Sequence, residues 1–210
     1  VKEAGDGIEV DTGIFACRFA SSGKYVLSSI TRAGREVLRD GALVLLRQDR
    51  TATADDAQVT QQRFDSAITR LTVEQRGPLR AVVKVEGKHA NAQRQWLPFT
   101  LRFYFYAGSD ALRVMHTIVF DGDENRDFVR GIGLQFTAPQ TAQLYDRHVR
   151  FAGVDDGVFG EAVRGLTGLR RDPGAPARRA QIAGEAVPAI TPVVEKLLQY
   201  IPAFGDWTPS

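Results

Sequence analysis

Three residues near the middle of the chain carry side chains that could together perform acid–base chemistry on an acidic sugar. Tyr104 and His116 can exchange protons with a substrate, and Arg130 can neutralise a carboxylate. A β-elimination at a uronic acid requires these functions: a base removes the proton at C5, a cation neutralises the carboxylate and an acid protonates the leaving oxygen. We therefore predict His116, Arg130 and Tyr104 as catalytic candidates. The prediction rests on their chemistry alone, and these residue types are common in proteins.

The segment that carries Tyr104 alternates strictly between apolar and polar residues. Within Leu101–Tyr106, the side chains of Arg102, Tyr104 and Tyr106 point to one side of a predicted strand. Tyrosine rings can stack on sugar rings, and arginine pairs with carboxylates through two parallel hydrogen bonds. We therefore predict Arg102, Tyr106 and the nearby Trp96 as substrate-binding residues. The alternative is an ordinary amphipathic strand with a half-exposed polar face.

His116 and Arg130 both fall on strand faces that the alternation predicts to be apolar. His116 shares its face with Val114 and Ile118. A histidine there is either a core residue with one hydrogen-bond partner or, in a cleft, a base that desolvation keeps neutral. Arg130 shares its face with Ile132, and a buried charge without a partner is costly. We expect its partner to be an acidic residue of the preceding loop or a carboxylate of a ligand.

The loop between these two strands has oxygen-bearing side chains at alternate positions, as calcium-binding loops do. Its match to an EF-hand fails, because the sixth position is Arg126 instead of glycine and the twelfth is Ile132 instead of glutamate. An acidic hairpin loop is the alternative. Calcium is the one cofactor that the sequence suggests, with four candidate ligands: Asp121, Asp123, Asn125 and Asp127.

The composition is that of a globular domain and argues against several classes of function. Of the 210 residues, 43% are hydrophobic and 25% are charged. The 27 basic residues are spread among 25 acidic ones, which argues against a nucleic-acid partner. No apolar run reaches the roughly 18 residues that span a membrane. The single cysteine, Cys17, excludes an intramolecular disulfide, and its alternating surroundings predict a buried thiol.

Short apolar runs separated by glycine, aspartate, asparagine and proline predict an all-β fold. We expect about ten to twelve antiparallel strands in a β-sandwich or a closed barrel. Asp40-Gly41 lies between apolar runs and predicts a hairpin turn. The β domain is predicted over residues 1–155. Residues 156–210 are expected to form a glycine- and proline-rich tail with an irregular loop at 170–179 and a short helix at about 192–201. Because the chain starts within a strand-like run without an initiator methionine, we expect a piece of a larger protein with a downstream domain.

Five segments in the central part of the chain form a combination that is more specific than any one of them. They are Gly77–Gly87, Trp96–Phe99, Arg102–Gly108, His116–Asn125 and Gly131–Leu134. Together they resemble the YetA-like exo-rhamnogalacturonan lyases, best over roughly residues 70–150. No catalytic motif of that family is carried over to this segment, so the candidate residues above rest on their chemistry.

The resemblance implies an architecture and an activity for the parent protein. It implies an N-terminal RIFT-type β barrel that precedes an α-helical toroid, in a lyase that cleaves rhamnogalacturonan, a pectin, by β-elimination from a chain end. The isolated domain is then expected to be inactive, with a polysaccharide or oligosaccharide and the downstream domain as partners. A secreted or periplasmic location follows from the polymeric substrate. The alternative is a non-catalytic carbohydrate-binding or structural β module, so whether the chain is part of an enzyme stays open.

Overall fold

The computed structural model describes residues 1–51, 59–152, 158–163 and 173–192, together with residues 194 and 196. These residues belong to two compact units, Val1–Pro139 and Gln140–Ser210, which are described separately below. No helix among the described residues is long and apolar enough to cross a membrane.

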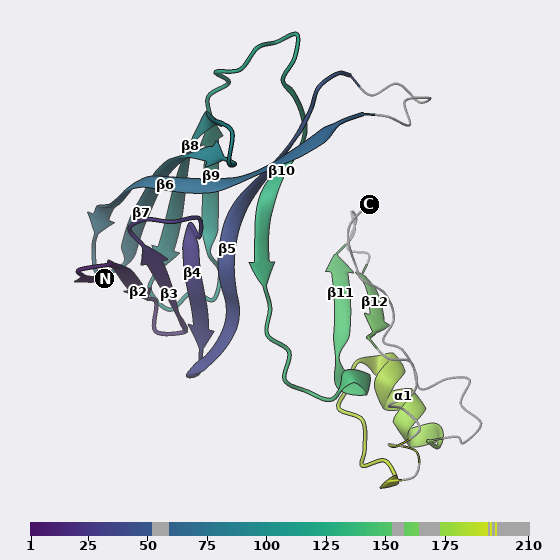
Figure 1. The fold of residues 1–210 in the computed structure, drawn as a ribbon. Helices are drawn as coiled ribbons and strands as arrows, with labels where there is room; N and C mark the ends of the chain where they lie inside the picture. Colours follow the sequence, from purple (N-terminus) through teal and green to yellow (C-terminus); the bar gives the residue numbers. More distant parts are fainter. Residues whose placement is uncertain (52–58, 153–157, 164–172, 193, 195, 197–210) are drawn as a thin grey trace. The chain divides into compact units, whose positions relative to one another are not determined.

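The first unit is built from antiparallel strands that mostly pair with their neighbours in sequence (Figure 1). The order runs from β1 to β9, and β10 lies off this path and pairs with β5. Its strands are β1 (Lys2–Ala4), β2 (Gly7–Asp11), β3 (Phe15–Ala20), β4 (Leu27–Arg32), β5 (Arg35–Gln48), β6 (Gln61–Arg76), β7 (Arg80–Ala90), β8 (Gln95–Tyr106), β9 (Arg113–Ile118) and β10 (Phe128–Thr137).

The long strand β5 joins the two layers of this unit. Its first half pairs with β4 and its second half with β6, so the sheet continues from one group of strands into the other. The ring of Phe19 in β3 lies 5.0 Å from that of Phe103 in β8, although β3 and β8 are not neighbours in the sheet. The strands therefore pack face to face, and the prediction of an antiparallel β-sandwich is confirmed.

The main core follows from the alternation that the sequence contains. In β8, Phe99, Leu101, Phe103 and Phe105 are buried and pack against apolar residues of β2, β3, β4 and β7. Each such side chain stabilises the fold by about 1.5–3 kcal/mol through the area removed from water. Cys17 belongs to the same core, which confirms the predicted burial of its thiol, and burial raises the pKa of this thiol to about 12.

A second, smaller core forms where the alternation in β8 breaks. Leu97 has a φ of +49°, which is unfavourable for a leucine by about 1–2 kcal/mol. The residue is nevertheless held from both sides: its backbone N–H donates to Asp121 Oδ1 at 2.6 Å, and its carbonyl oxygen lies 2.8 Å from His89 Nδ1. Because of this local change, Trp96 and Leu97 are both buried, together with Leu45 and Phe64. Of these four core residues, Leu97 is the one that hydrogen-bonds directly to the acidic loop, through Asp121.

The predicted hairpin at Asp40-Gly41 is wrong. Asp40 does adopt a positive φ of +56°, but the residue lies within β5 and the chain continues as a strand. The turn occurs earlier, at Ala33 and Gly34, both of which have positive φ. Pairing on both sides, with β4 and β10, keeps β5 extended through a dipeptide that alone favours a turn.

The second unit differs from the predicted tail. β11 (His148–Ala152) and β12 (Val158–Ala162) pair only with each other among the described residues, so the boundary lies at Pro139 rather than at residue 155. A helix, α1 (Ala175–Ala183), lies where an irregular loop was expected. In the helix predicted at 192–201, the described residues Pro192, Val194 and Lys196 are helical, and the rest lies outside the described residues.

The glycines and proline that suggested a loop in fact delimit α1. Gly174 is its N-cap, proline occupies its first turn and Gly184 is a left-handed C-cap with φ +70°. Proline is favoured in the first turn because the N–H that it lacks would have no helical partner. Glycine is favoured at the C-terminus because it tolerates the left-handed conformation. The short 3₁₀ helix η1 (Leu144–Asp146) precedes β11.

Candidate functional site

The outer face of strands β6 to β9 carries the polar residues that the sequence predicted for β8. In antiparallel pairs, residues directly opposite each other share a face. Arg102 of β8 lies opposite Lys84 and Met115, and Tyr104 lies opposite Arg113. The buried residues Leu101, Phe103 and Phe105 alternate with them. The prediction that Arg102, Tyr104 and Tyr106 share the outer face is therefore confirmed.

Arg102 is already paired within the protein. Its Nε and Nη2 donate to the two carboxylate oxygens of Glu74 at 2.8 and 3.1 Å. Lys84 Nζ lies 3.6 Å from the same carboxylate. The hydrogen bonds from Arg102 lower the pKa of Glu74, so this carboxylate stays ionised. Arg102 therefore braces the outer face, and its guanidinium is not free to pair with a ligand in the way that the sequence suggested.

Arg113 is an exposed cation of this face that lies directly beside Tyr104. Its guanidinium carbon lies 5.6 Å from the centre of the Tyr104 ring, within the range of a cation–π contact. No ion pair among the described residues involves Arg113, and the residue is exposed. Tyr106, two residues beyond Tyr104 on the same face, is 39% exposed. We name Tyr104, Tyr106 and Arg113 the outer platform.

The outer platform has the chemistry to bind an acidic sugar. Its tyrosine rings offer apolar surface and hydroxyl groups, and Arg113 offers five N–H donors in a planar fork that matches a carboxylate. Sequence reasoning missed Arg113 because β9 begins there and nothing in the sequence fixes the register of β9 on β8. The only available signal was a basic residue at the start of the strand that follows the predicted tyrosines.

Trp96 does not belong to this face, and its prediction as a substrate-binding residue is not supported by its position. The residue is 1% exposed and its ring packs edge-on against Phe64 and Phe120, with centroids 5.8 and 6.1 Å away. The guanidinium carbon of Arg94 lies 4.5 Å from the ring centre on another side. Trp96 is thus a core residue, because the left-handed backbone at Leu97 breaks the alternation of β8 and lets neighbouring side chains both be buried.

Arg130 is exposed at a β-bulge. Val129 pairs with Arg47 and Gly131 with Leu46, so Arg130 is the extra residue between two consecutive pairs. No ion pair among the described residues involves it. The expectation that Arg130 lies on an apolar face and needs a partner is wrong, since a bulge breaks the alternation from which it was inferred.

His116 lies on the inner face of β9. It pairs with Leu101, a core residue, while Tyr104 projects from the opposite face of the same sheet. His116 is nevertheless exposed, because β9 is at the end of the strand order. The three catalytic candidates are therefore not brought together: His116 and Tyr104 lie on opposite faces of β8–β9, and Arg130 lies on β10, which pairs with β5.

Desolvation lowers the pKa of His116, with a further contribution from the neighbouring His89. His89 is fully buried, and burial also lowers its pKa. Its Nε2 has no hydrogen-bond partner among the described residues. Both imidazoles are therefore expected to be neutral at pH 7.

We expect the Cε1 proton resonance of His116 to titrate with a midpoint below the ordinary histidine value of about 6.5. A histidine whose pKa is lowered on folding contributes stability that is complete above about pH 6.5 and is lost as the pH falls through the folded value. The measurement is a proton NMR titration, with the resonance assigned by a His116→Gln variant. A midpoint at or above 6.5 would contradict this environment.

The acidic loop that follows β9 is fixed by contacts within the protein. Asp127 accepts hydrogen bonds from Arg47 Nε at 2.7 Å and from both terminal nitrogens of Arg94 at 2.8 and 2.9 Å. It also accepts the backbone N–H of Asp123 at 2.8 Å. Asp127 is 4% exposed, and the hydrogen bonds from Arg94 are the main reason that its pKa is held far below the ordinary value. This residue anchors the loop to β5 and to the β7–β8 turn.

The predicted calcium ligands have other roles in this structure. Asp127 is occupied by two guanidinium groups, and Asp121 accepts the N–H of Leu97. Asp123 accepts the backbone N–H of Asn125 at 2.9 Å, as in a tight polar turn. Among the described residues, no group of three or more acidic, histidine or cysteine side chains could hold a metal ion. The loop is therefore an acidic loop that is fixed by arginine, but it is not the hairpin of the alternative, because β9 pairs with β8 and β10 pairs with β5.

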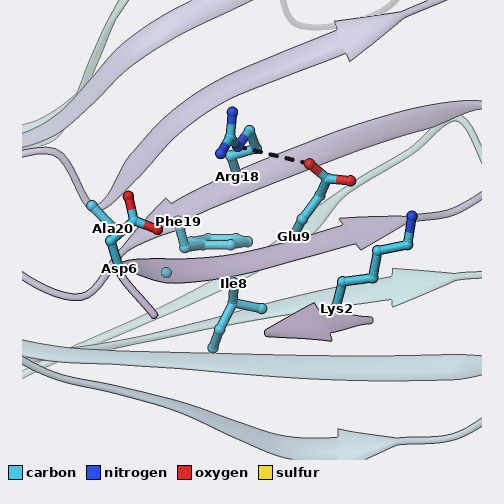
Figure 2. Close-up of a pocket in the computed structure, with 8 residues that line it drawn as sticks. Lys2, Asp6, Ile8, Glu9, Arg18, Phe19 and Ala20 are labelled. Carbon is cyan, nitrogen blue, oxygen red and sulfur yellow. Dashed lines mark ion pairs between the residues drawn. The ribbon is translucent and has the colours of Figure 1, made fainter. Parts of the chain in front are cut away.

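A shallow hollow of about 190 Å³ lies beside β1, β2 and β3 (Figure 2). Lys2 lies opposite Glu9, and Glu9 lies opposite Arg18, so charges of alternating sign cross the three strands. Arg18 Nε is 3.7 Å from Glu9 Oε2, and both side chains are well exposed. Ile8 points to the other side of β2, toward the core (Figure 2). Such a solvated pair contributes little to stability, which makes Arg18 suitable for control substitutions.

Two comparisons with known proteins agree with this architecture. A family model described as the PcRGLX-like protein central beta sandwich domain matches residues 1–210. The chain is also 35% identical over 188 residues to the uncharacterized protein YetA of Bacillus subtilis (strain 168). That alignment covers 88% of this chain but only 22% of YetA, so the chain spans about a fifth of that relative.

The family description refines the resemblance seen in the sequence. It gives the domain as central, where the resemblance implied an N-terminal position, and it gives the fold as a β-sandwich rather than a barrel. Both comparisons support the same group of proteins. The chain therefore belongs to the PcRGLX-like family of rhamnogalacturonan lyase-like proteins, as its central β-sandwich domain.

Proposed function

We propose that this domain binds a rhamnogalacturonan-type polysaccharide on the outer platform of β8 and β9. The observation that carries the proposal is Arg113, an exposed cation beside the Tyr104 ring that takes part in no ion pair among the described residues. A uronate in the polymer would pair its carboxylate with this guanidinium, and the tyrosine rings would contact the sugar faces. Arg102, which is hydrogen-bonded to Glu74, would lie beside this platform in a fixed position.

We further propose that the longer protein is a polysaccharide lyase and that this domain does not cleave the polymer alone. The candidate base and acid lie on opposite faces of one sheet, so they could not act on the same sugar. Catalysis would then need groups from elsewhere in the protein. Because pectic polymers lie outside the bacterial or plant cytoplasm, the proposal includes a secreted or periplasmic location.

The binding proposal predicts a loss of affinity when either part of the platform is removed. Changing Arg113 to Gln or Tyr104 to Ala is expected to weaken binding of rhamnogalacturonan oligosaccharides about tenfold, since each change removes one charge-assisted hydrogen bond or one ring contact. The measurement is isothermal titration calorimetry on the 210-residue chain. Arg18→Gln is the matched control, because Arg18 is an exposed arginine on a different strand.

Two results would argue against the outer platform. If Arg113→Gln and Arg18→Gln lowered the affinity equally, the effect would be a general one of net charge. If the unmodified chain bound no oligosaccharide, the proposal that it binds carbohydrate would be refuted.

Lyase activity is tested on the longer protein that contains this domain. β-Elimination leaves a double bond conjugated with the uronate carboxylate, so its products absorb ultraviolet light. We expect absorbance to rise when the whole protein acts on rhamnogalacturonan and to stay constant with the 210-residue chain. If absorbance did not rise with the whole protein, the lyase proposal would be refuted. If it rose with the 210-residue chain, the claim that catalysis needs other domains would be refuted.

A structural module is the second candidate function. It is favoured by exposed apolar side chains at the end of β9 and just after it, namely Ile118, Val119 and Phe120, at 41–60%. Exposed apolar patches often mark surfaces that pack against other proteins or domains. This candidate predicts no saturable oligosaccharide binding, so the calorimetric titration separates it from the first.

A further inference from the structure

A second hollow in the first unit is formed by segments that are far apart in the sequence. It has a volume of about 210 Å³ and is lined by residues that precede β4 and by residues of β5, β6 and β10. The lining residues that matter here are Lys24, Tyr25, Asp40, Asp65, Gln135 and Phe136. We name this site the Lys24 hollow. It is smaller than the pockets of roughly 300–1,000 Å³ that hold drug-sized ligands, so its size suits a single sugar ring.

The backbone around the Lys24 hollow is fixed by specific contacts. The carbonyl of Lys24 accepts a hydrogen bond from the buried hydroxyl of Ser66, which in turn accepts the N–H of Leu43 at 3.0 Å. On the opposite side, Phe136 faces a β-bulge in β5, where Asp40 and Gly41 lie between the partners of Gln135 and Thr137. Its ring lies against Gly41, where a Cβ would come within 2.6 Å of the ring. The hollow therefore depends on a bulge, a glycine and an anchored loop.

The charged groups in the Lys24 hollow are satisfied unequally. Arg63 donates from Nε to Asp65 Oδ1 at 2.9 Å and from Nη2 to Gln135 Oε1 at 2.6 Å. Asp40 lies 3.6 Å from Arg39. Lys24 has no ion pair among the described residues, and its ammonium is 5.1 Å from the centre of the Tyr25 ring. The Lys24 ammonium therefore has no acidic partner among the described residues, whereas the carboxylates of Asp40 and Asp65 already have basic partners.

We infer that the Lys24 hollow is a subsite for one acidic sugar residue, separate from the outer platform. The Lys24 ammonium receives the sugar carboxylate, and the remaining acceptor oxygens of Asp40 and Asp65 receive sugar hydroxyls. The rings of Tyr25 and Phe136 offer apolar surface to the sugar ring. A neutral sugar would leave the cation unused and therefore bind more weakly. The inference rests on the proposed function for its polymer, a uronate-containing polysaccharide.

The test uses the ¹⁵N-labelled 210-residue chain and galacturonate as the probe. We expect the amide signals of Tyr25, Ala42 and Thr137 to shift saturably with galacturonate and much less with galactose, its neutral counterpart. Lys24→Gln is expected to weaken this binding about tenfold, since it removes a charge-assisted hydrogen bond. The control is Lys88→Gln, because Lys88 is an exposed lysine of β7 that has no ion pair among the described residues.

Several results would overturn the subsite. These are an absence of saturable shifts around the hollow, equal shifts with galactose, or unchanged affinity in Lys24→Gln. The same spectra, recorded with rhamnogalacturonan oligosaccharides, report on the outer platform through the amides of Tyr104 and Arg113. Shifts there without shifts at the hollow would refute the subsite alone, and shifts at the hollow alone would refute the outer platform instead.

Discussion

Replacing Asp127 with asparagine is expected to lower the free energy of unfolding by about 3 kcal/mol, because it leaves two guanidinium groups without their counter-charge. The Asp127 side chain is only 2% exposed, and that of Arg47 is 15% exposed. Arg94 is more exposed, at 39%, so its share of the loss is smaller. The measurement is urea denaturation followed by tryptophan fluorescence, since Trp96 lies against Arg94 in the same region.

The same residue predicts how stability depends on pH. Folding holds the pKa of Asp127 far below its unfolded value of about 3.9, so the folded state favours the ionised form. A carboxylate with a depressed pKa contributes stability that is complete above about pH 5 and is lost as the pH falls toward the folded value. The Asp127→Asn variant lacks this titration. Its stability is therefore expected to approach that of the unmodified chain as the pH is lowered.

A matched control separates this effect from a general change of charge. Asp49 is an exposed aspartate whose nearest basic partner, Arg50, is 3.9 Å away. We expect Asp49→Asn to change the stability by less than about 0.5 kcal/mol. Equal stabilities of the Asp127 and Asp49 variants would mean that the buried cluster does not hold the loop.

Replacing Trp96 with alanine is expected to lower the free energy of unfolding by about 3–5 kcal/mol, as for other buried large-to-small changes. The change removes the ring between Phe64 and Phe120 and the surface on which Arg94 rests. Far-ultraviolet circular dichroism during urea denaturation measures the loss without relying on the deleted chromophore.

Trp96 and Tyr104 should respond in opposite ways, which distinguishes a core residue from a binding residue. Tyr104→Ala is expected to impair oligosaccharide binding with a smaller loss of stability, because the side chain is only partly buried on the outer face. Trp96→Ala, assayed well below its unfolding transition, should retain binding at the outer platform. If Trp96→Ala stayed stable but lost oligosaccharide binding, Trp96 would be a substrate-binding residue, as the sequence suggested.

The sequence predicted the parts of the fold that depend on local alternation. In β8, Leu101 and Phe103 face the core and Arg102 and Tyr104 face outward, as expected from a period of two. The all-β class and the family resemblance were likewise accessible, because they rest on short apolar runs and on motifs within the chain. Which strand pairs with which, and in what register, was not accessible from these patterns.

The errors occurred where a single residue breaks the alternation. The left-handed Leu97 buries Trp96, and the bulge at Arg130 exposes a charge that was expected to be buried. The change at Leu97 is accompanied by its hydrogen bond to Asp121, and the change at Arg130 by the register of β10 on β5; local sequence reveals neither. The hairpin expected at Asp40 failed for a related reason, since pairing on both sides keeps β5 extended.

The candidate site changed in composition for a similar reason. Arg102 was predicted to meet a ligand, but Glu74 from β6 reaches it across β7. Arg113 was not predicted, because its position beside Tyr104 depends on the register of β9. Register is a property of the folded sheet, so the position of Arg113 beside Tyr104 became visible only in the structure.

The most direct test of the central claim is to map oligosaccharide binding on the ¹⁵N-labelled chain. Rhamnogalacturonan oligosaccharides are expected to shift the amides of Tyr104, Tyr106 and Arg113 saturably, and Arg113→Gln is expected to weaken these shifts where Arg18→Gln does not. Saturable shifts confined to other strands, or none at all, would contradict the assignment of the outer platform as the polysaccharide-binding face.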